Sequence, residues 1–90
     1  MAEASDVVRT RRLEVVDEEG RVRVVAGMIH RDDLVSIFGL VVRDHNGRDR
    51  VCVYDYDDGA AEVGLDFGGD TVVSLGVSDT GEPYVYLSEE

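Results

Sequence analysis

Hydrophobic and polar residues alternate along most of the chain, in short runs separated by turn residues. Alternation with a period of two places successive side chains on opposite faces of a β-strand. No stretch of useful length has the 3.6-residue period of an amphipathic helix. The pattern therefore predicts an all-β chain, with strands near residues 9–17, 21–28, 38–44, 48–56, 61–66, 70–77 and 83–88.

A repeated turn motif, D/S-x-x-G, separates several of these runs. A short polar side chain at its first position can accept a backbone hydrogen bond, and glycine at its fourth tolerates the positive φ of a G1 bulge. A further turn is predicted at Asp57-Asp58-Gly59. Tight turns between consecutive strands predict an antiparallel meander of about seven strands built from repeated hairpins. The motif occurs at Asp17–Gly20, Asp44–Gly47, Asp66–Gly69 and Ser78–Gly81.

One phase of the alternation is almost entirely apolar, and we expect it to form the core. The opposite phase also carries apolar residues among its charges, so both faces need cover. A meander covers one face by curling into a barrel, folding as a sandwich or assembling as an oligomeric β-prism. The expected core comprises Leu13, Val15, Val22, Val24, Leu40, Val42, Val51, Val53, Val63, Leu65, Val73, Leu75, Val77, Val85 and Leu87.

Partner subunits are expected to cover what a chain of 90 residues cannot. An open sheet also has edge strands that must be paired or protected, and the last strand carries two tyrosines of the kind enriched at interfaces. We predict a homo-oligomer, with a trimer preferred to a dimer and a different protein partner left open. The candidate interface or ligand face comprises Tyr54, Tyr56, Tyr84, Tyr86, Leu34, Val35, Ile37 and Phe38.

The predicted organisation is a flexible segment at residues 1–8 and a single all-β domain at residues 9–88. An insertion at residues 29–37 interrupts the repeat and brings several apolar residues together. Two interpretations stay open for its side chains, which either plug one end of the fold or contact a partner.

Charge narrows the possible partners. Nine arginines and no lysines face 20 acidic residues, a formal charge of −11. Nucleic-acid binding depends on cationic side chains that displace counterions from phosphates, so it is not expected. Anionic lipid surfaces are disfavoured for the same reason, and no apolar run approaches the roughly 20 residues that span a bilayer. The first residues resemble no secretory signal, and we expect a cytoplasmic protein.

Candidate chemistry is sparse. Cys52 is the only cysteine, which excludes an internal disulfide and multi-cysteine metal motifs. The acidic turn that begins at Asp55 lacks the ligand spacing of a calcium-binding EF-hand loop. His30 and His45 have acidic neighbours but no third group that would complete a catalytic constellation. We therefore predict no catalytic residue, cofactor or metal, and a protein that is not an enzyme.

The segment Leu13-Glu14-Val15-Val16-Asp17-Glu18-Glu19-Gly20-Arg21-Val22-Arg23-Val24 resembles uncharacterised bacterial β-hairpin repeat proteins, with units like L-x-V-x-D-x-x-G-x-x-R-x-x-L. The likeness covers roughly residues 12–88, and the third unit departs from it at Asp70 and Thr71. It implies an elongated or prism-like β assembly without a known activity, so no functional residue is carried over. We predict a structural or oligomerising module. The alternative is a small module that binds a sugar or peptide on a tyrosine-bearing sheet face.

Overall fold

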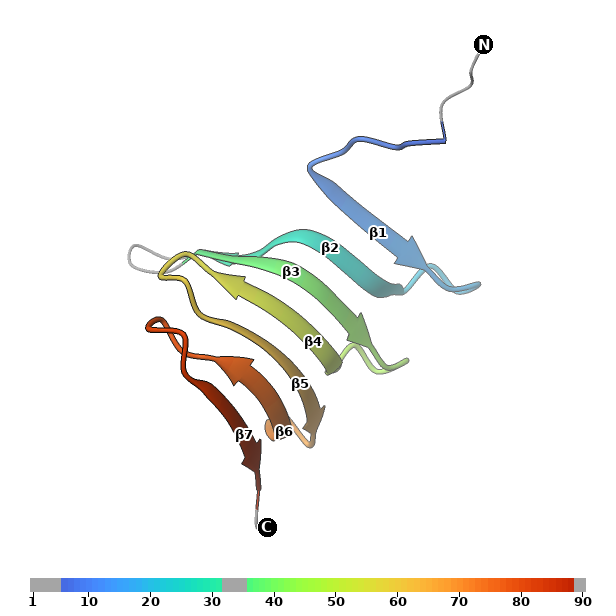
Figure 1. Cartoon of the computed structure of the whole chain (residues 1–90). Helices are drawn as coiled ribbons and strands as arrows, with labels where there is room; N and C mark the ends of the chain where they lie inside the picture. Colours follow the sequence, from blue (N-terminus) through green and yellow to red (C-terminus); the bar gives the residue numbers. More distant parts are fainter. Residues whose placement is uncertain (1–5, 32–35, 89–90) are drawn as a thin grey trace.

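A computed structural model of the chain describes residues 6–31 and 36–88. These residues form one antiparallel sheet in which each strand pairs with its neighbours in sequence (Figure 1). The predicted all-β meander of seven strands is confirmed, and its predicted bounds agree with the structure to within three residues. The strands are β1 (Arg12–Val16), β2 (Val22–Arg31), β3 (Ser36–Arg43), β4 (Asp49–Tyr56), β5 (Ala61–Phe67), β6 (Asp70–Val77) and β7 (Pro83–Leu87).

The sheet is open. Strands β1 and β7 lie at opposite edges and each pairs with a single neighbour, β2 and β6 respectively. The expectation that the chain itself curls into a barrel is therefore wrong. Closure would need β1 to pair with β7, and contacts between strands join only sequence neighbours in the described residues.

Three of the four D/S-x-x-G motifs form the predicted turn. At Asp44 the backbone carbonyl accepts from Gly47 N–H at 3.0 Å, and Asp44 N–H donates to the carbonyl of Arg48 at 2.9 Å. The Asp44 carboxylate also accepts from the N–H groups of Asn46 and Arg48, at 2.9 and 3.1 Å. The turns that begin at Asp17 and Ser78 repeat all four bonds. A short side chain that accepts hydrogen bonds at the first position thus fixes the conformation of each of these three turns.

The motif at Asp66–Gly69 forms a different turn. Phe67 pairs directly with Asp70, so only Gly68 and Gly69 lie between β5 and β6. Their φ values are 66° and 92°, and a type I′ turn requires positive φ at both of these positions. The Asp66 carboxylate accepts from the Thr71 hydroxyl at 3.0 Å and from no backbone group of the turn. The double glycine overrides the motif, because two residues suffice to reverse the chain.

The face that we expected to be the core is the more exposed one. Val25, Val41, Cys52 and Ser74 are the buried side chains of the described residues, with exposed fractions of 5% or less, and they lie on the opposite face. The described residues form a single sheet with no second layer, so burial comes from within the sheet. On the opposite face, for example, the Tyr84 hydroxyl lies over Gly76.

The segment expected as an insertion at residues 29–37 extends two strands in its described part. Residues 29–31 continue β2, and residues 36–37 begin β3. A register shift between Met28 and His30 marks the place where the β2–β3 pairing changes. Leu34 and Val35 lie outside the described residues, so the plug that they were expected to form is not addressed.

Candidate functional site

One face of the sheet, here called the apolar face, carries rows of apolar side chains that follow from the register of the strands. One row crosses all seven strands and contains only aliphatic residues: Leu13, Ala26, Leu40, Val53, Val63, Leu75 and Val85. A second row does the same: Val15, Val24, Val42, Val51, Leu65, Val73 and Leu87. A third row runs from β2 to β7: Met28, Phe38, Asp55, Ala61, Val77 and Pro83.

Many of these side chains are exposed to solvent although they are apolar, and the others are half-buried. Leu75, Val85 and Leu87 are 59%, 66% and 64% exposed, and even Leu40 near the middle of the sheet is 37% exposed. Asp55 is the only charged residue of the three rows. A continuous exposed apolar surface of this kind usually marks an interaction site.

A hollow of about 410 Å³ lies on the apolar face over β4–β7. Most of its lining belongs to the first and third rows: Val53, Ala61, Val63, Leu75, Val77 and Pro83. The hollow could receive an apolar group, but it offers little to orient a polar one.

The opposite face, here called the tyrosine face, carries polar contacts at one end of the strands. Glu62 on β5 accepts hydrogen bonds from Tyr56 at 2.9 Å and from Tyr84 at 2.8 Å. The rings of Tyr54 and Tyr56 meet edge to face with centroids 6.0 Å apart. Burial and the acceptor Glu62 raise the pKa of Tyr56, and Glu62 also raises the pKa of Tyr84. These phenols are held in their neutral form.

Glycines make room for the tyrosines. A Cβ at Gly76 would stand 2.8 Å from the Tyr84 hydroxyl and would overlap the Ala61 carbonyl oxygen. Gly39, which pairs with Tyr54, has no room for a Cβ beside the Val53 carbonyl. The tyrosine rings can therefore lie close to the backbone of the sheet.

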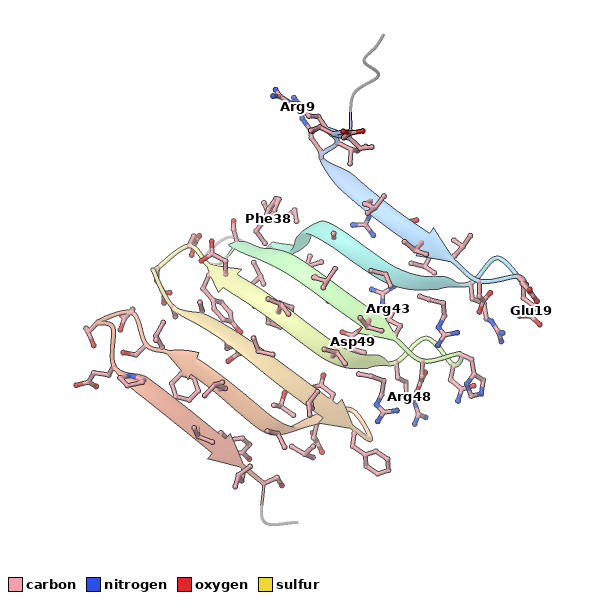
Figure 2. The ribbon with its side chains drawn as sticks, turned by 45° about the vertical axis from the view of Figure 1, so that its right-hand side comes forward. Arg9, Glu19, Phe38, Arg43, Arg48 and Asp49 are labelled. Carbon is pink, nitrogen blue, oxygen red and sulfur yellow. The ribbon has the colours of Figure 1, made fainter. Side chains whose placement is uncertain are left out.

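Arginines occupy the other end of the tyrosine face (Figure 2). Arg23 donates to the Arg43 carbonyl at 2.8 Å, and Arg43 in turn pairs with Asp49 at 3.1 Å. Arg50 donates to the Asp66 carbonyl at 2.9 Å, and its guanidinium lies 5.8 Å from the centre of the Phe67 ring. These guanidinium groups are engaged within the sheet.

The predicted site residues are divided between the two faces. Tyr54, Tyr56 and Tyr84 lie on the tyrosine face with Tyr86, and Ile37 shares that face because it pairs with Tyr56. Phe38 lies on the apolar face, and Leu34 and Val35 lie outside the described residues. Sequence reasoning did not propose the first two rows as a site, because it had assigned all of their residues except Ala26 to the core.

The described residues assemble little that is chemically reactive. Within residues 6–31 and 36–88, no group of three or more His, Cys, Asp and Glu side chains could hold a metal ion. Burial raises the pKa of the Cys52 thiol, whose Sγ lies 3.8 Å from the Asp66 carboxylate, so the less reactive protonated form is favoured. In the same residues, no helix is long and apolar enough to cross a membrane.

Comparisons with protein families, curated proteins and solved structures give no significant match.

Proposed function

We propose that this chain is a non-catalytic structural module that assembles with further copies of itself through the apolar face. The observation that carries the proposal is the pair of complete rows, fourteen aliphatic side chains in unbroken cross-strand register. Such a surface has no hydrogen-bonding group to recognise a polar ligand. A second copy presents the same chemistry, so the surface is complementary to itself.

The size of the face supports a stable interface. Seven strands about 4.8 Å apart and three rows about 7 Å apart give a patch of roughly 30 by 20 Å, or on the order of 600 Å². That is the upper end of what soluble monomers expose, and it is near the contribution of one partner to an ordinary interface. At about 25 cal/mol per Å², its burial gives roughly 15 kcal/mol per copy before the costs of association.

The distribution of charge fits the same arrangement. Arginines, hydrogen-bonded acids and acidic turns lie on the tyrosine face or at the strand ends. Sheets that pack with their apolar faces inward therefore keep almost all charges in water. We place a cyclic trimer, a β-prism, ahead of a two-sheet dimer, in keeping with the prism-like assemblies that the sequence resembles.

Light scattering after size-exclusion chromatography, at low and high salt, tests this proposal. We expect a defined oligomer at both salts, with tighter association at high salt because each copy carries −11. Leu75→Glu should produce monomers, since it places a charge in the first row, which crosses all seven strands. Thr80→Glu adds the same charge at an exposed turn and should leave assembly intact. A wild-type monomer at high concentration would refute the proposal.

The alternative, sugar or peptide binding on the tyrosine face, has less support because Tyr56 and Tyr84 already donate their hydroxyl protons to Glu62. The double variant Tyr54→Ala/Tyr84→Ala separates the two functions. A ligand-binding module loses its ligand and keeps its assembly size. If the chain is an assembly module that works through the apolar face, the double variant keeps the wild-type oligomer, and neither protein binds a sugar or peptide.

A further inference from the structure

We propose that Phe38 of one copy inserts into the hollow on the apolar face of a second copy. The inference rests on the proposed function, because it specifies how two apolar faces fit together. The two features involved are an exposed aromatic ring and an apolar depression, and both belong to the third row of the same face.

Phe38 is the projecting feature. Its side chain is 54% exposed, and it is the only aromatic residue of the three rows. The other phenylalanine, Phe67, stands at the opposite end of the strands, where the Arg50 guanidinium lies against its ring. No such cation or aromatic ring lies against Phe38 among the described residues. Figure 2 shows Phe38 at the end of the sheet away from Arg43 and Asp49.

The hollow suits a phenyl ring in chemistry and in size. Its lining is mostly aliphatic, although Tyr54 and Glu62 also border it, and its volume is about 410 Å³, whereas a closed cavity of roughly 150 Å³ already holds benzene. Tyr54 is the one aromatic residue of its lining, and Tyr54 belongs to the tyrosine face.

Phe38 does not line the hollow of its own chain. The register places Asp55 next to Phe38, Ala61 beyond it and Val77 beyond that. At about 4.8 Å between strands, Ala61 and Val77 stand roughly 10 and 14 Å from Phe38. Both features also point to the same side of a single layer. A second copy that faces the first brings the ring of one copy to the hollow of the other.

The contact is reciprocal in a two-fold pair and sequential in a cyclic trimer. Each copy gives one Phe38 and receives one in either case, so no ring and no hollow is left over. A ring seated in a hollow also fixes the register of the two faces, which smooth rows of valine and leucine would leave free to slide. Large aromatic anchors in pockets commonly dominate such interfaces.

The experiment is a double-mutant cycle on the dissociation constant of the full chain, measured by analytical ultracentrifugation. Phe38→Ala removes the ring, and Ala61→Phe fills the hollow from within; Ala61→Leu replaces it if the larger variant does not fold. We expect each single change to weaken association at least ten-fold. The double variant should associate no more weakly than Ala61→Phe alone. Once Ala61→Phe has filled the hollow, the ring of Phe38 makes no contact there that Phe38→Ala could remove. Phe67→Ala is the matched control and should leave association unchanged.

The outcomes separate this inference from the proposed function. Suppose that wild type assembles and Leu75→Glu dissociates it. If Phe38→Ala then has no effect, or if the effects of Phe38→Ala and Ala61→Phe on association are additive, the ring does not occupy the hollow, and the proposed assembly module stands. If wild type is a monomer, both ideas fall. Non-additive losses at Phe38 and Ala61, with Phe67→Ala silent, support the contact.

Discussion

The Tyr84 hydroxyl donates to the Glu62 carboxylate at 2.8 Å, although these residues lie on β7 and β5 with β6 between them. The bond crosses Gly76, which pairs with both residues and has no side chain to block the approach. Tyr56 reaches the same carboxylate from β4 at 2.9 Å. One glutamate thus ties together strands on both of its sides, within a layer that has no second sheet behind it.

Replacing Glu62 should change the titration of these tyrosines. Glu62 raises the pKa of Tyr84, while burial and Glu62 raise that of Tyr56. Glu62→Gln removes the negative charge and keeps the shape, so both phenols should ionise at lower pH than in wild type. Absorbance of the phenolate during an alkaline titration measures this. Identical titration curves for the two proteins would contradict the bonds.

The same shifts predict how stability depends on pH. A phenol whose pKa is raised by folding contributes stability that is fully present below the ordinary tyrosine value of about 10 and is lost as pH rises through the raised value. Wild type should therefore lose stability above about pH 10. Glu62→Gln should show a smaller loss over that range, in urea denaturation at fixed protein concentration.

Gly39 and Gly64 form a matched pair for testing how closely the backbone packs. A Cβ at Gly39 would overlap the Val53 carbonyl oxygen, whereas at Gly64 the nearest atom would be 3.6 Å away. Gly39→Ala should lower the free energy of unfolding by about 3 kcal/mol, because backbone must move to accept it. Gly64→Ala should cost less than about 1 kcal/mol. Equal costs in chemical denaturation would show that the close approach is not real.

Asp44 tests the contribution of the turn motif. Its carboxylate accepts from Arg48 N–H and from Asn46 N–H, and these bonds hold its pKa below the ordinary value. The stability they give is present above the ordinary aspartate pKa and is lost as pH falls through the lowered one. Asp44→Ala should lower the urea midpoint at neutral pH. Asp44→Asn keeps an acceptor oxygen and should lose less, with a weaker dependence on acid pH.

The strands and most turns could be predicted because they depend on local signals. Alternation identifies which residues share a face, and an aspartate three residues before a glycine specifies the turn at Asp17 and Asp44. The turn at Asp66 differs because Gly68 and Gly69 can reverse the chain by themselves, a choice that the motif does not encode. Alternation with a period of two also does not predict which face is buried. Burial depends on contacts such as that of Tyr84 with Gly76, which form only in three dimensions.

The candidate site was missed for the same reason. Apolar alternation has the same appearance whether the side chains face a core within the chain or a partner, and Leu40 and Val63 gave no sign of which applies. Only the open sheet, with β1 and β7 unjoined, shows that the part of the chain that the structure describes supplies no second layer for them. Phe38 was suspected as a contact residue, but together with residues that the structure places on the other face or does not describe.

Asp55 provides the most selective test of an interface on the apolar face. It is the only charged residue in the three rows, and it lies between Phe38 and Ala61. Any partner that brings Phe38 to the hollow must cover this carboxylate or force it toward the strand end, and removing a charge from water is costly unless it is paired. A two-fold pair would also bring two copies of Asp55 near each other.

Asp55→Leu should therefore tighten association, by about ten-fold or more in the dissociation constant, and extend the aliphatic row without a break. Asp58→Leu makes the same substitution at an exposed turn residue, so it controls for the lost negative charge and added apolar surface. Sedimentation equilibrium of both variants measures the difference. If Asp55→Leu and Asp58→Leu change association equally, the effect is one of net charge, and Asp55 does not lie in the interface.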